Sequence, residues 1–181
     1  MIVAITGTPG VGKTSVSKYL QEKDYLVVDL HNLINKNGFV IDFDEKRDSK
    51  IVDVEKLGNY VSNNFKDKNL VFVESHLAHS LSCVDKVILL RLHPDYLRKN
   101  LESRRWNAEK IKENLEAEIL DVILCEVADS FTEDDIFEVD TTGKNVEEIG
   151  NIIIEIAENK FKNMKRYKIG NIDWSEEILN L

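Results

Sequence analysis

The sequence predicts a three-layer α/β fold, in which a five-stranded parallel sheet lies between two layers of helices. Five short aliphatic runs are typical of strands covered on both faces: they lie at 2–5, 26–28, 70–73, 87–90 and 136–139. Helical patterns separate these runs, and such alternation favours parallel strands joined by right-handed crossovers. The 181 residues are enough for one domain with a proper core, so a single domain is expected.

The first strand leads directly into a glycine-rich loop and then a helix. Residues 7–14 read Gly-Thr-Pro-Gly-Val-Gly-Lys-Thr, which is the Walker A pattern for the phosphates of a nucleoside triphosphate. The glycines let backbone N–H groups turn inward around phosphate oxygens, and the helix N-terminus adds partial positive charge. Lys13 is expected to reach the β and γ phosphates, and the Thr14 hydroxyl to ligate Mg²⁺.

The segment 29–52, after the second strand, is too polar for a core crossover, with charged residues at 42 and 44–48. We expect it to lie over the carboxyl edge of the sheet, where open α/β sheets bind ligands. Asp53 then fits the N-cap of a helix. The apolar face of that helix contains Val54, Leu57, Val61 and Phe65.

The third strand ends in an acidic residue that is followed by two histidines. In P-loop proteins such an acidic residue holds Mg²⁺, often through water, and Glu74 is placed for that role or for orienting an attacking hydroxyl or water. His76 and His79 are candidates for positioning groups or carrying protons. Alternatively, both histidines cap the loop and bond to the backbone.

Four of the six arginines fall within fifteen residues, beginning at the end of the fourth strand. Arginines stabilise the charge on a transferring phosphoryl group through bidentate hydrogen bonds. On this ground Arg91 and Arg104 are expected to contact phosphate, whereas Arg105 is left open. A solvated basic helix face is the better interpretation of Arg98.

Two further helical faces and a loop complete the domain. The helical faces contain residues 111, 115, 119 and 122, and residues 146, 149, 153 and 156. The loop 140–144 reads Asp-Thr-Thr-Gly-Lys and follows the last strand. It either packs on an adenine ring or is an ordinary turn with capping residues.

The composition excludes several classes of protein. A net charge of −9 argues against a protein that coats nucleic acid, and no apolar run of 18 residues is present for a membrane span. The first strand begins at residue 2, which leaves no room for a signal peptide. Cys83 and Cys125 lack the spacing of a metal site or disulfide framework, so reduced thiols and a cytoplasmic location are expected.

The ordered set of motifs resembles the adenylate kinase isoenzyme six family of P-loop nucleoside monophosphate kinases, which has archaeal members and a eukaryotic nuclear ATPase type. The resemblance covers roughly residues 2–158. Besides the phosphate loop it rests on Asp-Leu at 29–30, Phe-Asp-Glu at 43–45, Ile-Val-Asp at 51–53, the acidic-x-His step at 74–76, and Arg91 thirteen residues before Arg104. Glu74 departs from the aspartate of the eukaryotic members.

The resemblance implies an adenylate-kinase-like P-loop NTPase fold, with an NMP-binding segment near 29–52, a LID near 103–113 and a basic C-terminal tail near 160–181. It implies reversible transfer of the γ-phosphate of Mg²⁺–ATP to a nucleoside monophosphate, with AMP as the preferred acceptor, together with ATPase activity. It also implies participation in maturation of the small ribosomal subunit, including 16S-type rRNA processing, through the ribosomal protein uS11. The alternative is an assembly-factor ATPase switch with little kinase activity.

The resemblance also carries roles to particular positions of this chain. The implied catalytic residues are Lys13, Glu74, His76, Arg91 and Arg104. The implied ATP-binding residues are Gly10, Gly12, Lys13, Thr14, Ser15 and Arg104. The implied NMP-binding residues are Asp29, Asp44 and Arg47, and the implied Mg²⁺ ligands are Thr14 and Glu74. The basic stretch 160–168 and Trp174 either offer a partner an exposed tail, or the tail folds back on the core.

Overall fold

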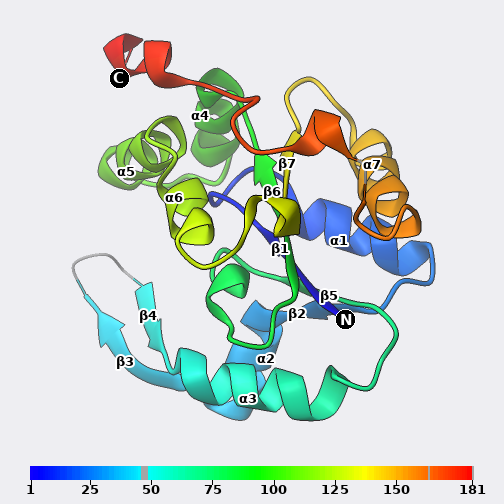
Figure 1. Cartoon of the computed structure of the whole chain (residues 1–181). Coiled ribbons are helices and arrows are strands. Elements are labelled where there is room, and N and C mark those ends of the chain that lie inside the picture. Colours follow the sequence, from blue (N-terminus) through cyan, green and yellow to red (C-terminus); the bar gives the residue numbers. More distant parts are fainter. Residues whose placement is uncertain (46–48, 163, 181) are drawn as a thin grey trace.

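Five parallel strands form the central sheet in the order β2-β5-β1-β6-β7 (Figure 1). They are β1 Ile2–Thr6, β2 Val27–Asp29, β5 Val71–Glu74, β6 Lys86–Arg91 and β7 Ile136–Asp140. The computed structural model of the chain describes residues 1–45, 49–162 and 164–180. All five predicted strands are confirmed, and each ends in a polar or charged residue at the carboxyl edge of the sheet.

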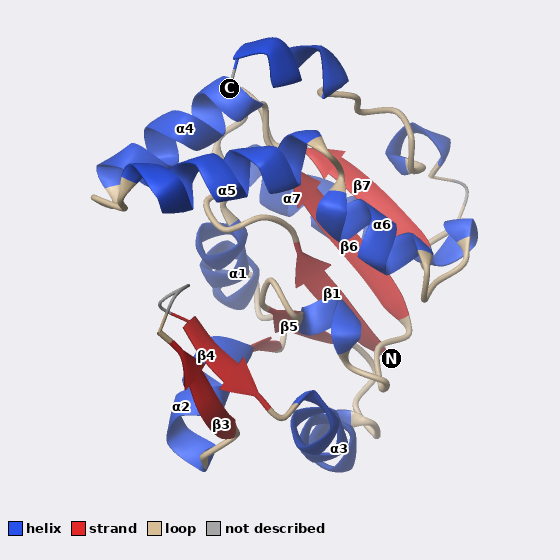
Figure 2. Cartoon of the chain, turned by 90° about the vertical axis from the view of Figure 1, so that its left-hand side faces the viewer, coloured by secondary structure: helices blue, strands red, loops and turns tan. Residues whose placement is uncertain are grey.

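Helices cover both faces of the sheet, which confirms the predicted three layers (Figure 2). The helices of the outer layers are α1 Lys13–Glu22, α2 Leu30–Asn37, α3 Val54–Phe65, α6 Val122–Ala128 and α7 Val146–Glu158. Along β1, Val3 and Ile5 pack in one core with α1 and α7, whereas Ile2 and Ala4 pack in a second core with α2, α3 and α6. Burial on both faces explains why the strands read as continuous apolar runs.

Capping residues set two of the helix starts. The Asp53 side chain accepts a hydrogen bond from the backbone N–H of Lys56, so the predicted N-cap of α3 is confirmed. At the start of α7, Asn145 and Glu148 form a capping box, in which each side chain bonds to the backbone of the other residue.

Two helices, α4 Pro94–Ser103 and α5 Ala108–Ile119, lie side by side beyond β6 (Figure 2). The predicted helical face through 111, 115, 119 and 122 is correct only as far as Ile119. Asp121 has a φ of 56°, and its carboxylate accepts a hydrogen bond from Arg91, which separates α5 from α6. Val122 therefore begins a new helix and is exposed.

The segment 29–52 forms α2 and a separate antiparallel hairpin of β3 Val40–Asp44 and β4 Ser49–Val52. The hairpin stands apart from the main sheet, on the side of the molecule where α4 and α5 also lie (Figure 2). Val40, Ile41 and Phe43 are exposed on it. The segment thus contributes α2 to the core, whereas its β3–β4 hairpin projects outward with both apolar and charged residues exposed.

Of the two alternatives for the C-terminal segment, the structure favours a segment that folds back on the core, because its first part is buried there. Phe161, Met164 and Tyr167 are buried in the same core as α1 and α7. Four short 3₁₀ turns complete the described chain: η1 Ala78–Ser80, η2 Glu133–Asp135, η3 Lys165–Tyr167 and η4 Ser175–Asn180. Beyond η3 the chain crosses toward α4 and α5, and the Trp174 ring centroid lies 4.9 Å from that of His93 (Figure 1). None of the described helices has the length and apolar character needed to span a membrane.

Candidate nucleotide-binding site

The phosphate loop connects β1 to α1 and packs tightly on its surroundings. Gly7, Gly10 and Gly12 all have positive φ, at 138°, 107° and 104°, a region that side chains rarely allow. A Cβ on Gly7 would lie 2.3 Å from the carbonyl oxygen of Leu90, and one on Gly10 would lie 2.8 Å from a methyl group of Leu97. The loop is therefore held against β6 and α4 by contacts that only glycine permits.

Lys13 lies over this loop, at the start of α1. Its Nζ donates hydrogen bonds to the carbonyl oxygens of Gly7 at 2.7 Å and Thr8 at 3.1 Å, and the side chain is buried. Burial lowers the pKa of Lys13 to about 8, while the carboxylates of Glu74 and Glu118 act in the opposite direction. The ammonium group is thus held inside the loop, where a triphosphate would supply the negative charge it lacks.

Three oxygen-bearing side chains meet beside Lys13 at the carboxyl edge of the sheet. Glu74 ends β5 and is buried, near Thr14 in the first turn of α1. Asp29 ends β2 and lies opposite Glu74 in the register of the parallel β2–β5 pair. Burial raises the pKa of Glu74, and Asp29 contributes in the same direction whereas Lys13 opposes it. Hydroxyl and carboxylate oxygens are the ligands that Mg²⁺ prefers, so Thr14 and Glu74 fit the ion that accompanies ATP.

The two histidines after β5 are placed differently. His76 is exposed at this edge, and partial desolvation with the nearby Lys13 charge lowers its pKa to about 4, so its ring is neutral near pH 7. His79 is buried instead, with Nδ1 3.0 Å from the Thr6 hydroxyl and Nε2 3.1 Å from a carboxylate oxygen of Glu126. His79 therefore joins the end of β1 to α6, a contact between distant segments that a sequence pattern does not reveal.

The expected LID, residues 103–113, covers the turn between α4 and α5 and the first half of α5. Arg104 is exposed there, with its guanidinium 5.8 Å from the centre of the Trp106 ring. Lys110 lies 4.9 Å from the same ring, which places Trp106 between two cations. Besides burial, the Arg104 charge contributes slightly to the lowered pKa of Lys13.

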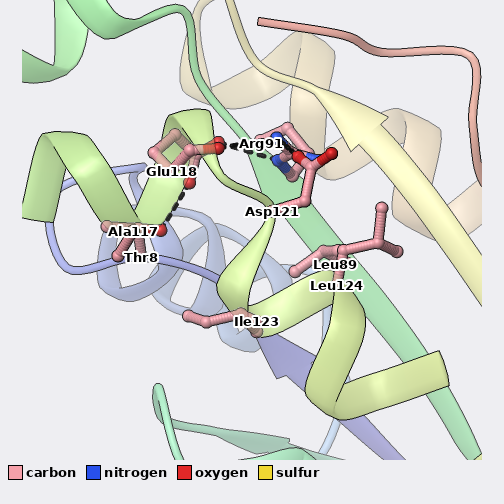
Figure 3. A pocket seen from close by; sticks show the side chains of 8 residues that line it. All are labelled: Thr8, Leu89, Arg91, Ala117, Glu118, Asp121, Ile123 and Leu124. Atoms are coloured by element: carbon pink, nitrogen blue, oxygen red, sulfur yellow. Dashed lines mark hydrogen bonds and ion pairs between the residues drawn. The ribbon is translucent and has the colours of Figure 1, made fainter. Parts of the chain in front are cut away.

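The Arg91 side chain lies behind the phosphate loop, next to Thr8, and is surrounded by carboxylates. Its side chain is 2% exposed, and its guanidinium donates to the carboxylates of Glu118, Glu138 and Asp121 and to the backbone carbonyl of Glu118. Figure 3 shows Arg91, Glu118 and Asp121 of this cluster together with Thr8, around a small pocket. The pocket is lined by Thr8, Leu89, Arg91, Ala117, Glu118, Asp121, Ile123 and Leu124. Every guanidinium nitrogen of Arg91 has a partner, so a phosphate contact would require these bonds to rearrange.

Two of the three residues expected to bind the monophosphate lie in the described part of the chain. Asp29 is the N-cap of α2, and its carboxylate accepts hydrogen bonds from the backbone and side-chain nitrogens of Asn32 at 2.9 and 2.6 Å. Asp44 is half-buried at the end of β3. Arg47 lies outside the described residues.

Three polar contacts to the phosphate loop come from residues that the motifs do not mark. The Thr8 hydroxyl donates to Glu118 on α5, and Asn100 Nδ2 on α4 donates to the carbonyl oxygen of Gly10 at 2.9 Å. The Thr141 hydroxyl after β7 lies 3.4 Å from the carbonyl oxygen of Val11, so the 140–144 loop does lie beside the phosphate loop. Glu118 and Asn100 each stand one position from an apolar helix residue, and only their packing distinguishes them from surface residues.

The chain is similar to one family model and to several archaeal proteins. Residues 3–121 match the family model described as an AAA domain. Three archaeal proteins, each named "Putative adenylate kinase", are similar over nearly the whole chain. The one from Thermococcus gammatolerans is 44% identical over 97% of this chain and 94% of its own length. The one from Archaeoglobus fulgidus is 41% identical over 98% and 94%, and the one from Methanosarcina barkeri is 40% identical over 98% and 100%.

Solved structures agree on the fold. Thymidylate kinase from Candida albicans superposes with a TM-score of 0.59 at 15% identity, over 88% of this chain and 92% of that chain. A gluconokinase from Sinorhizobium meliloti gives 0.52 at 16% identity, over 90% and 96%. At such identities the similarity concerns the fold alone.

Proposed function

The chain belongs to the family of archaeal "Putative adenylate kinase" proteins, and on this premise we propose that it transfers the γ-phosphate of ATP to a nucleoside monophosphate, with AMP as the preferred acceptor. One observation carries the proposal. The phosphate loop, with Lys13 inside it and Glu74 of β5 beside it, is flanked by two projecting parts, the β3–β4 hairpin and the α4–α5 pair (Figure 2). A site that holds two nucleotides needs a contact segment on each side of the transferred phosphate.

Each group has a defined task in this proposal. The loop amides and the Lys13 ammonium bind the β and γ phosphates, and Arg104 from the α4–α5 turn contributes further positive charge. Glu74 holds the metal or orients the attacking oxygen. Thr14 and Glu74 would hold the Mg²⁺ that accompanies ATP, and the ion would supply further charge neutralisation on the phosphates. Positioning and charge stabilisation supply most of the catalysis in phosphoryl transfer, and little covalent chemistry is required of the protein.

The test mixes ATP and Mg²⁺ with AMP, CMP, UMP, GMP or dTMP in turn and resolves all products by chromatography. We expect two ADP molecules per ATP consumed with AMP, and less product with the other acceptors. Lys13→Ala should reduce transfer by at least about a hundredfold, since the phosphates lose their main charged partner. Formation of ADP and inorganic phosphate alone, at a rate that AMP does not change, would refute the kinase.

The second candidate is an ATPase that acts as an assembly-factor switch in small-subunit maturation, through uS11. It is favoured by the position of Glu74 next to Lys13 and Thr14, where the carboxylate can orient a water as readily as a substrate hydroxyl. The basic residues near the C-terminus support it less, because Arg166 pairs with Glu155 and Lys168 with Asp134. Phosphate release without any monophosphate measures this activity, and binding of uS11 in the ATP state but not the ADP state would establish the switch.

A further inference from the structure

Glu118 joins three segments of the protein that lie far apart in the sequence. It stands on α5, yet its side chain is only 2% exposed. Oε2 accepts a hydrogen bond from the hydroxyl of Thr8 in the phosphate loop. Oε1 accepts from Nε of Arg91 at 2.8 Å and from the backbone nitrogen of Leu92 at 3.1 Å. All three partners are donors, so both carboxylate oxygens are used, as Figure 3 shows for Thr8 and Arg91.

Thr8 in turn shapes the loop around Lys13. Its carbonyl oxygen accepts from Lys13 Nζ at 3.1 Å and from the backbone nitrogen of Val11 at 3.3 Å. Its side chain is buried, and Glu118 is the partner of its hydroxyl. The position of Glu118 therefore affects both the turn from Thr8 to Val11 and the place of the lysine ammonium.

The other end of α5 belongs to the turn that carries Arg104. Asn107 caps the helix, and Ile111 and Leu115 anchor it in the core with α1. Glu118 lies eleven residues after Asn107 on the same helix. Since a helix moves as a rigid element, a displacement of the turn would also displace Glu118. Glu118 is thus placed where the expected LID and the phosphate loop are mechanically connected.

We propose that Glu118 is a positioning residue, which links α5 to the phosphate loop and, through Thr8, holds the loop in the geometry that ATP requires. The inference rests on the proposed function, because it assumes that this loop binds ATP. Glu118 does not touch the reacting groups and acts only through Thr8. A loop that is held in its binding geometry loses less conformational entropy when ATP binds, so removal of this contact should weaken ATP affinity more than it slows the chemical step.

The experiment uses four single variants and one double variant of the full chain. Thr8→Val removes the hydroxyl at nearly constant shape, and Thr8→Ser restores it. Glu118→Gln removes the charge, while Arg91 keeps its partners Glu138 and Asp121. Glu116→Gln is the matched control, because this residue is half-exposed on the same helix and pairs only with Lys112 among the contacts described. The Kd for a non-hydrolysable ATP analogue with Mg²⁺ is measured by calorimetry, and KM and kcat with ATP and AMP.

Thr8→Val and Glu118→Gln should each raise the Kd and KM for ATP about tenfold, with kcat changed less than about threefold. Thr8→Ser should recover most of the affinity that Thr8→Val loses, and Glu116→Gln should resemble the unmodified chain. The Thr8→Val/Glu118→Gln double variant should bind no more weakly than the weaker single variant, because both remove the same contact.

Two results would overturn the linkage. One is an unchanged Kd in Thr8→Val, even if its thermal stability falls. The other is a double variant whose increase in Kd equals the product of the two single increases. Failure of the unmodified chain to bind the analogue at all would refute the proposed function itself, and with it this inference. The two failures are therefore distinguishable.

Discussion

Arg91 provides the sharpest test of the ion cluster behind the phosphate loop. The guanidinium makes hydrogen bonds to three carboxylates and one carbonyl, and two of these carboxylates, Glu118 and Glu138, are themselves buried. Replacing Arg91 by Met keeps much of the volume of the stem but leaves these carboxylates without their cation. Breaking a buried ion pair by removing one partner costs about 3–5 kcal/mol of unfolding free energy.

For a domain of this size, that loss corresponds to a decrease in Tm of roughly 6–20 °C. Urea denaturation followed by circular dichroism gives the free energy, and differential scanning calorimetry gives the Tm. The control is Arg166→Met, which removes an exposed ion pair with Glu155 and should cost less than about 1 kcal/mol. Adding Glu138→Gln to Arg91→Met should recover part of the loss, because it removes one of the uncompensated charges.

A decrease below about 1 kcal/mol in Arg91→Met would refute this reasoning, since it would mean that the carboxylates do not depend on the arginine. If such a variant also lost phosphoryl transfer by at least about a hundredfold, Arg91 would act mainly on phosphate, as the resemblance to the kinase family implies.

Three other changes to the chain test the fold. Truncation after Asn159 removes the buried side chains of Phe161, Met164 and Tyr167. It should unfold the protein or lower its free energy of unfolding by several times about 1.5 kcal/mol. Truncation after Gly170 keeps these side chains, and equal stability of the two truncated chains would contradict the prediction. Gly150→Ala should destabilise the α1–α7 contact by about 1–3 kcal/mol, because a Cβ there would lie 2.2 Å from the Tyr19 ring, and Tyr19→Leu should restore it. Burial lowers the pKa of His79, so the neutral ring is favoured in the folded state; stability should fall as the pH drops from about 7 to about 5, and fall less in His79→Leu.

Local sequence patterns were sufficient for the strands and for the phosphate loop. Burial on both faces requires uninterrupted aliphatic residues, and the left-handed backbone at Gly7, Gly10 and Gly12 requires glycine, so both features are visible without a structure. The end of a strand can also be predicted from the sequence, because the aliphatic run stops there at a polar or charged residue. Glu74 was therefore expected at the carboxyl edge, and the sheet places it there beside Thr14.

Contacts between helices are a different matter. Nothing in the spacing of α5 distinguishes the buried Glu118 from the half-exposed Glu116 two residues earlier. The end of α5 at Ile119 was also missed, because the turn at Asp121 depends on an ion pair with Arg91, thirty residues away. Such pairings depend on which surfaces the fold brings together, and a helical period contains no information about that.

The sequence alone determined that this protein has a Walker A loop on a parallel α/β sheet, because the backbone geometry of both allows few residue types. Only the tertiary structure decided what the charged residues do. It places Arg91 among carboxylates and buries the start of the C-terminal segment in the core, because a charged side chain takes the partner that the packed fold supplies, and that partner lies far away in the chain.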